Sequence, residues 1–205
     1  MIPEEGEEIM YRKQMALQRV LCILFIAASI LVFIYALGFM TDAYDMLTPY
    51  DGKTGEIRQL MTDMDLFDRD LVKWGIGLIL VSLCLLLTNT HTRRKYYISN
   101  YIATGLVCAA AFAVSISAHG TIADLRSRYY SGIIDFETVK NALDSHPGRR
   151  PPLGVFTDSP FWFDAHYFVF GILLVTAVLL AANAIWKIVL MKQEKGVLLA
   201  DKEVG

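Results

Sequence analysis

The sequence predicts an all-α membrane protein, a four-helix transmembrane bundle with a small, mostly helical extracytoplasmic cap. Two observations lead to this class. The 205-residue chain is 55% hydrophobic, which is more than a soluble domain normally contains, although 20% of its residues are charged. The charged residues are unevenly placed, because four windows contain no Asp, Glu, Lys or Arg: 20–41, 74–92, 96–123 and 165–186. This distribution excludes a single soluble core and also a disordered or fibrous chain.

Each window is long enough to cross a bilayer as a helix, which requires about 20 apolar residues. We therefore predict transmembrane spans at 20–41, 74–92, 96–118 and 166–186. The remaining parts are an N-terminal segment, a first outer segment, a short turn, a second outer segment and a C-terminal tail, at 1–19, 42–73, 93–95, 119–165 and 187–205.

The basic residues predict the orientation of the spans. Arg93, Arg94 and Lys95 occupy the three-residue turn, and short basic loops are retained in the cytoplasm. Ten of the 19 Lys and Arg residues lie in the predicted inner segments, whereas 14 of the 21 Asp and Glu residues lie in the outer ones. We expect a multi-pass protein of the plasma membrane with both termini in the cytoplasm.

A cleaved signal peptide is the alternative for the first span. Arg12, Lys13 and Arg19 precede the apolar run, and the small residues Ala36 and Gly38 follow it. The run is longer than the usual hydrophobic region of ~7–15 residues, so we favour an uncleaved span.

Helical spacing continues through the first outer segment. Apolar residues recur there at steps of three and four on the approach to the second span: Ile57, Leu60, Met61, Met64, Phe67 and Leu71. We predict a helical hairpin projecting beyond the membrane, with a β-hairpin about Asp51 and Gly52 as the lesser alternative.

The second outer segment mixes helix and loop. Ile122, Leu125 and Tyr129 prolong the third span, and 135–143 has the pattern of a short amphipathic helix with Asp135 as its N-cap. The Pro-rich stretch 146–152 is predicted to be a loop. The two outer segments together would form the cap, whereas the N-terminal segment would lie along the inner surface before the first span.

The three cysteines exclude several classes of protein. Cys22, Cys84 and Cys108 all lie inside predicted spans, so a disulfide-built ectodomain is excluded. No Cys-x-x-Cys motif is present, which excludes thiol oxidoreductases that depend on one.

Histidines and aspartates near the outer ends of the third and fourth spans form a candidate metal site. Its ligands would be His119, His166, Asp124 and Asp164, and imidazole and carboxylate groups are common ligands of transition metals. Polar residues at the membrane interface are the simpler interpretation.

Other motifs give no catalytic site. The acidic stretch Asp63, Asp65, Asp68 and Asp70 lacks the glycine turn and terminal Glu of a calcium loop, so we interpret it as a solvated helix face. We found no catalytic signature and no dinucleotide fingerprint. We expect no cofactor and no nucleic-acid partner, and we favour a protein that is not an enzyme.

No span holds an acidic or basic residue in its central portion, and neighbouring helices can satisfy the uncharged polar residues there. The main ones are Ser29, Ser82, Thr104, Ser115, Thr176 and Asn183. Since ionisable residues inside spans usually mark ion or proton pathways, a coupled transporter core is not expected.

Small residues recur every four positions in the third span, at Gly105, Ala109, Ala113 and Ser117. Such spacing lets helices approach closely. The favoured interpretation places this stripe at the centre of the chain's own bundle, and the alternative makes it a docking face for another subunit.

These observations favour a non-enzymatic accessory or interaction protein. It would contact membrane lipid and bind other membrane subunits, as part of a larger complex such as a transporter, or bind a second copy of itself. The alternatives are a small membrane enzyme or metal-binding protein that uses the histidine and aspartate site, and a homo-oligomeric pore.

Overall fold

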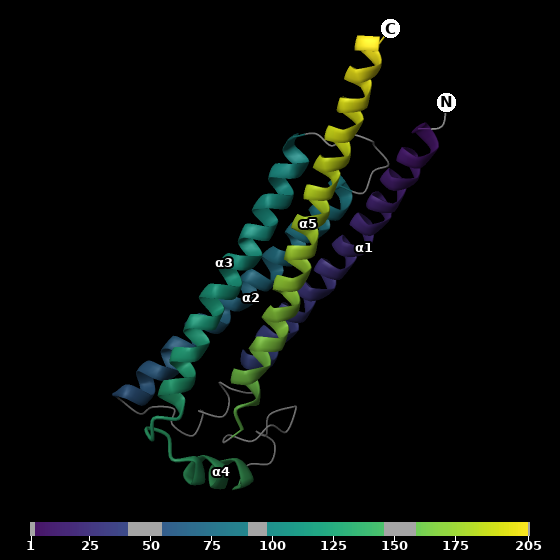
Figure 1. Ribbon diagram of the computed structural model, residues 1–205. Helices are drawn as coiled ribbons and strands as arrows, with labels where there is room; N and C mark the ends of the chain where they lie inside the picture. The colour runs from purple at the N-terminus through teal and green to yellow at the C-terminus, as the bar shows by residue number, and fades with distance from the viewer. Residues whose placement is uncertain (1–2, 41–54, 90–97, 146–158, 205) are drawn as a thin grey trace.

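The computed structural model describes residues 3–40, 55–89, 98–145 and 159–204 (Figure 1). These residues are almost entirely helical and contain no strand. The helices, in chain order, are α1 (Pro3–Gly38), α2 (Glu56–Asn89), α3 (Ile98–Tyr129), α4 (Phe136–Ser145) and α5 (Phe161–Val204).

Four helices are long and apolar enough to cross a membrane, which confirms the predicted multi-pass, all-helical class. The segments that meet this criterion are Ile9–Gly38, Glu56–Asn89, Ile98–Tyr129 and Phe161–Gln193. In each of them more than half of the most apolar window faces away from the protein interior. Apolar side chains on an outer surface are stable where lipid surrounds them.

The four long helices form a ring in the order α1, α2, α3, α5, because α1 packs against α2 and α5, and α3 packs against the same two. Neighbours in this ring are antiparallel, as in an up-down-up-down bundle. Both chain termini lie at one end of the bundle and α4 lies at the other (Figure 1). We call these the termini end and the α4 end.

The buried face of each long helix follows a repeat of about 3.5 residues. In α3 all buried positions except Val107 alternate between steps of four and three: Thr104, Cys108, Ala111, Ser115, Ala118, Ile122, Leu125 and Tyr129. The same alternation runs through α1 and α5. A repeat of 3.5 keeps one stripe facing the neighbouring helices over a long distance, as in left-handed coiled coils.

An aromatic cluster closes the bundle at the α4 end. Phe39 is fully buried, and its ring centroid lies 5.9 Å from Tyr35, 5.9 Å from Phe67 and 5.7 Å from Phe163. These four rings come from α1 and the turn after it, from α2 and from α5. Edge-on and tilted ring pairs add to the free energy of burying the rings themselves.

Glycine permits the close approach of α1 and α2. A Cβ atom on the buried Gly75 would lie 3.0 Å from the Cα atom of Phe33. Since that neighbour is backbone, a larger residue at this position would force the two helices apart.

The predicted helix in the second outer segment is confirmed. Asp135 accepts hydrogen bonds from the backbone N–H groups of Glu137 and Thr138 and from the Thr138 hydroxyl, so it is the N-cap of α4. These bonds to the charged form lower the pKa of Asp135. Phe136 packs on Tyr129 and Tyr130 and thereby attaches α4 to the end of α3.

Two other helical predictions have different outcomes. The helix before the second span is confirmed, because α2 begins at Glu56 and buries Leu60 and Met64. The N-terminal segment does not lie apart from the first span. The helix α1 is continuous from Pro3, and Tyr11 and Met15 are buried in the bundle, so that expectation is wrong.

Several predicted features lie outside the described residues. They are the basic turn Arg93, Arg94 and Lys95, the possible β-hairpin at Asp51 and Gly52, and the proline-rich loop 146–152.

Candidate functional site

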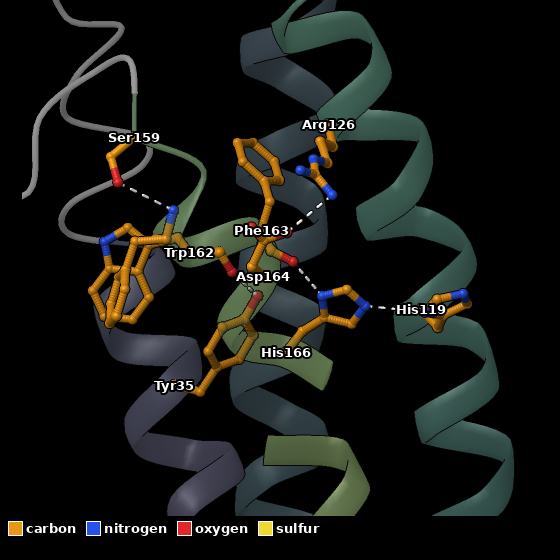
Figure 2. A network of polar contacts seen from close by, with 9 residues as sticks. Tyr35, His119, Arg126, Ser159, Trp162, Phe163, Asp164 and His166 are labelled. Carbon is orange, nitrogen blue, oxygen red and sulfur yellow. Dashed lines mark hydrogen bonds and ion pairs between the residues drawn. The ribbon is translucent and has the colours of Figure 1, made fainter. Parts of the chain in front are cut away.

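Polar side chains gather where α3 and α5 meet at the α4 end (Figure 2). The last turns of α3 contribute His119 and Arg126, and the first turns of α5 contribute Asp164 and His166. The start of α5 is defined locally. The Phe161 N–H donates to the Ser159 hydroxyl, and the Asp164 N–H donates to the Pro160 carbonyl.

His119 and His166 are in direct contact. His119 Nδ1 lies 3.0 Å from His166 Nε2, and Nδ1 of His166 contacts the backbone carbonyl of Phe163. A carbonyl only accepts, so His166 carries its hydrogen on Nδ1 and leaves Nε2 as an acceptor for His119 Nδ1–H. His166 is buried and His119 is exposed.

The predicted acidic ligands do not join this pair. Asp164 lies 2.9 Å from Arg126 in an ion pair, and Asp124 lies 3.6 Å from Arg128. No group of three or more His, Cys, Asp or Glu residues able to hold a metal occurs among the residues that the structure describes. The two histidines therefore converge as the hypothesis requires, but the four-ligand metal site is not assembled.

Ion pairs with arginine explain why Asp124 and Asp164 do not join the two histidines. Arg128 also lies 2.6 Å from Asp63 of α2, and this hydrogen-bonded partner raises the pKa of Arg128. One turn of α3 thus joins α5 through Arg126 and α2 through Arg128. Each of these carboxylates gains a partner that attracts it more strongly than a neutral imidazole does.

Polar side chains also meet inside the bundle towards the termini end. The amide nitrogen of Asn183 on α5 donates to the amide oxygen of Gln18 on α1. Across the bundle, Asn89 of α2 donates to the Thr104 hydroxyl of α3 at 2.9 Å. Antiparallel packing brings these four residues, one from each long helix, to a similar level.

Lys187 lies about one turn beyond this layer and is fully buried. Its ammonium group is 3.1 Å from the Met15 sulfur and 5.7 Å from the Tyr11 ring centroid. Lys187 is the first residue of the predicted C-terminal tail. Its burial was not predictable from local spacing, because Met15 and Tyr11 belong to the distant helix α1.

The small hydroxyl residues within the spans mostly bond to their own helix. Ser29 donates to the Phe25 carbonyl, Ser115 to the Ala111 carbonyl and Thr176 to the Ile172 carbonyl. These three hydroxyls therefore have their partners on their own helices and do not need one from a neighbouring helix. A serine or threonine hydroxyl easily reaches the carbonyl four residues earlier.

The small-residue stripe of α3 does not lie inside the bundle. Gly105, Ala109, Ala113 and Ser117 are all exposed, and a Cβ atom on Gly105 would have nothing within 4 Å. The favoured interpretation, in which the stripe packs within the chain's own bundle, is wrong. The buried face of α3 is also made of small residues, including Cys108 and Ala111, so composition alone does not distinguish the two faces.

The acidic stretch of α2 is only partly a solvated face. Asp65 pairs with Arg69 at 2.8 Å and Asp70 pairs with Lys73 at 2.8 Å, all on the surface. Asp68 instead is buried, with 1% of its surface exposed. The solvated interpretation is wrong for this residue, because Asp68 lies one turn from both Met64 and Leu71 on the face that packs into the core.

The chain matches no family model, no curated protein and no solved structure.

Proposed function

We propose that the protein is a non-enzymatic accessory subunit that binds a larger membrane complex, such as a transporter, through the outward face of α3. One observation carries the proposal. The stripe Gly105, Ala109, Ala113 and Ser117 is exposed, and a different face of the same helix serves the chain's own bundle. Small side chains let a second helix approach closely, and close packing drives association in lipid.

The same proposal includes a location. The excess of Lys and Arg in the predicted inner segments supports a plasma-membrane protein with both termini in the cytoplasm. The α4 end would then be the extracytoplasmic end, and α4 with the two outer segments would form the cap. The ion pairs of Arg126 and Arg128 and the packing of α4 on Tyr129 and Tyr130 support this part of the proposal.

Enlarging the stripe tests the proposal. The double variant Ala109→Ile, Ala113→Ile is expected to lose its partner on purification in mild detergent, with affinity reduced about tenfold or more by the lost close approach. The thermal unfolding temperature should be unchanged, because neither side chain enters the bundle. The measurement is the amount of a single identified partner that co-purifies with tagged protein.

Two alanines on other helices provide the matched control. Ala27 of α1 and Ala182 of α5 are also exposed small residues, and Ala27→Ile with Ala182→Ile should keep the partner bound. Equal recovery of the partner with both double variants would contradict the proposal. A monodisperse monomer that brings no partner from native membranes would do the same.

A membrane metal-binding protein or small metalloenzyme is the second candidate, and one contact favours it. The 3.0 Å separation of His119 Nδ1 and His166 Nε2 suits two nitrogen ligands of one ion. The carbonyl of Phe163 orients His166 from behind, as backbone carbonyls commonly orient metal-bound imidazoles. Solvent would supply the remaining ligands on the exposed side of His119.

Titration of the purified protein with Zn²⁺ or Co²⁺ tests this second candidate. His119→Ala and His166→Ala should each abolish measurable binding, because one imidazole alone holds such ions weakly. Asp124→Asn should leave binding unchanged, since that carboxylate faces Arg128. Binding that survives both histidine substitutions would exclude the pair as a metal site.

A further inference from the structure

The carboxyl group of Asp68 has no hydrogen-bond partner among the residues that the structure describes. The residue lies on α2 in the half of the bundle nearest α4, and only 1% of its surface is exposed. Neither carboxyl oxygen accepts or donates a hydrogen bond. A buried carboxylate without a hydrogen bond or a counter-charge is among the most costly groups a protein can contain.

The surroundings of Asp68 cannot stabilise a negative charge. From α1, Tyr35 is the titratable group that acts on it, and the Tyr35 hydroxyl already donates to the Trp162 carbonyl at 2.8 Å. From α2 itself, the nearby charge is the carboxylate of Asp65, which repels a second negative charge. Phe67, the preceding residue, packs on Phe39.

Four basic groups among the described residues at this end of the bundle pair with other acids. Arg69 pairs with Asp65 on α2, and Lys73 pairs with Asp70. On α3, Arg126 pairs with Asp164 of α5, and Arg128 pairs with Asp63. Each of these four pairs holds its basic group beside a carboxylate other than that of Asp68.

A metal ion is a poor substitute for the missing counter-charge. Calcium and similar hard cations require about six or more oxygen ligands, and smaller cations require a nearly complete octahedron. Asp68 belongs to no group of three potential ligands in the described part of the chain. A single proton removes the negative charge of the carboxyl group with no further ligand.

We propose that Asp68 is a proton-binding site in the seam between α1 and α2. It is a neutral carboxylic acid in the closed bundle and releases its proton when the α4 end loosens. The proposal does not depend on the proposed docking function. It adds a pH-sensitive element to the half of the bundle that carries α4.

The direction of the pH dependence follows from burial. Asp68 precedes the charge-free window 74–92 and lies in the charged part of α2, which ends at Lys73. Burial, with repulsion from Asp65 as the smaller cause, raises the pKa of Asp68 to about 8. The unfolded chain would release this proton near pH 4. Between these two pH values the folded state binds more protons at Asp68 than the unfolded state does. The contribution of Asp68 to the free energy of unfolding is therefore greatest below about pH 4 and is lost as the pH rises towards 8.

Thermal unfolding in detergent at a series of pH values tests the proposal. The unfolding temperature of the natural protein should fall by about 5–10 °C between pH 5 and pH 9. Asp68→Asn, which keeps the shape of a neutral acid, should reduce that fall to less than half. Asp70→Asn, an exposed acid one turn away, should retain the full fall.

Infrared spectroscopy gives a readout that a purely structural role would not change. The natural protein at pH 6 should show the carbonyl stretch of a buried protonated carboxylic acid, and this band should disappear by pH 10. The band should be absent from Asp68→Asn at both pH values and present in Asp70→Asn at pH 6. The spectrum of the natural protein alone remains decisive if Asp68→Asn does not fold.

Two results would overturn the proposal. One is the absence of a protonated-acid band at pH 6 in the natural protein. The other is an unfolding temperature that depends on sodium or calcium concentration at fixed pH and loses that dependence in Asp68→Asn, because a bound cation would then replace the proton.

Discussion

Phe39→Ala is expected to lower the free energy of unfolding by about 3–5 kcal/mol, the usual cost of removing a fully buried aromatic ring. Phe39 is 0% exposed and its ring contacts those of Tyr35, Phe67 and Phe163. Its loss would leave a cavity that three helices share, and antiparallel helices with long contact surfaces cannot easily collapse into it. Equilibrium unfolding in mixed detergent micelles, followed by tryptophan fluorescence, measures the change.

Phe168→Ala is the matched control for this experiment. Phe168 lies on α5 and is 69% exposed, so its ring faces outward and its removal should cost less than about 0.5 kcal/mol. A similar loss of stability in the two variants would show that Phe39 is not enclosed as the structure describes.

The second large effect is expected from the buried amide pair Gln18 and Asn183. Gln18→Leu should destabilise the protein by about 1–3 kcal/mol, because the Asn183 amide would lose its partner while remaining buried. The double variant Gln18→Leu, Asn183→Leu should be close to the natural protein in stability, because both amides of the pair are removed together and neither is left without the other. A double-mutant cycle of unfolding free energies measures the coupling between the two residues.

The outcome that contradicts this prediction is simple additivity. If the double variant loses as much stability as the two single variants together, the amides do not act as a pair. Ala27→Leu, an exposed position of α1, controls for the effect of adding an apolar side chain to that helix.

Composition and local spacing predicted the helices well, for reasons that are local. A run of about 20 apolar residues has to satisfy its backbone hydrogen bonds within itself when lipid surrounds it, so helix follows directly. The N-cap of α4 was equally predictable, because Asp135 accepts hydrogen bonds from Glu137 and Thr138, which lie two and three residues further along the chain. Neither prediction requires knowledge of a distant part of the chain.

The histidine pair was predictable only in part. His119 lies in the last turns of α3 and His166 in the first turns of α5, so antiparallel packing brings both to the same end of the bundle. Whether Asp124 and Asp164 join them depends on the arginines that compete for these acids. That competition is set by the rotation of α3 about its axis, which places Arg126 towards α5 and Arg128 towards α2.

The burial of two ionisable residues was likewise not predictable from the local sequence. Asp68 and Lys187 are ionisable residues close to the ends of charge-free windows, and on that basis each was predicted to be exposed to water. The structure buries both, because the neighbouring helix extends alongside them: Tyr35 of α1 lies near Asp68, and Tyr11 and Met15 of α1 enclose Lys187. A charge count treats each residue separately, whereas burial depends on what packs against it.

Four charge-free windows were therefore sufficient to predict a four-span helical protein, since the cost of placing charge and unpaired backbone in lipid applies to each segment independently. Which face of each helix turns inward was not predictable in the same way. In α3 the exposed residues Gly105 and Ala109 differ little in size from the buried Cys108 and Ala111 on the adjoining face. The buried side of α3 is determined over its whole length, by Ile122, Leu125 and Tyr129 packing against the other helices, and that choice leaves the stripe of small residues facing outward.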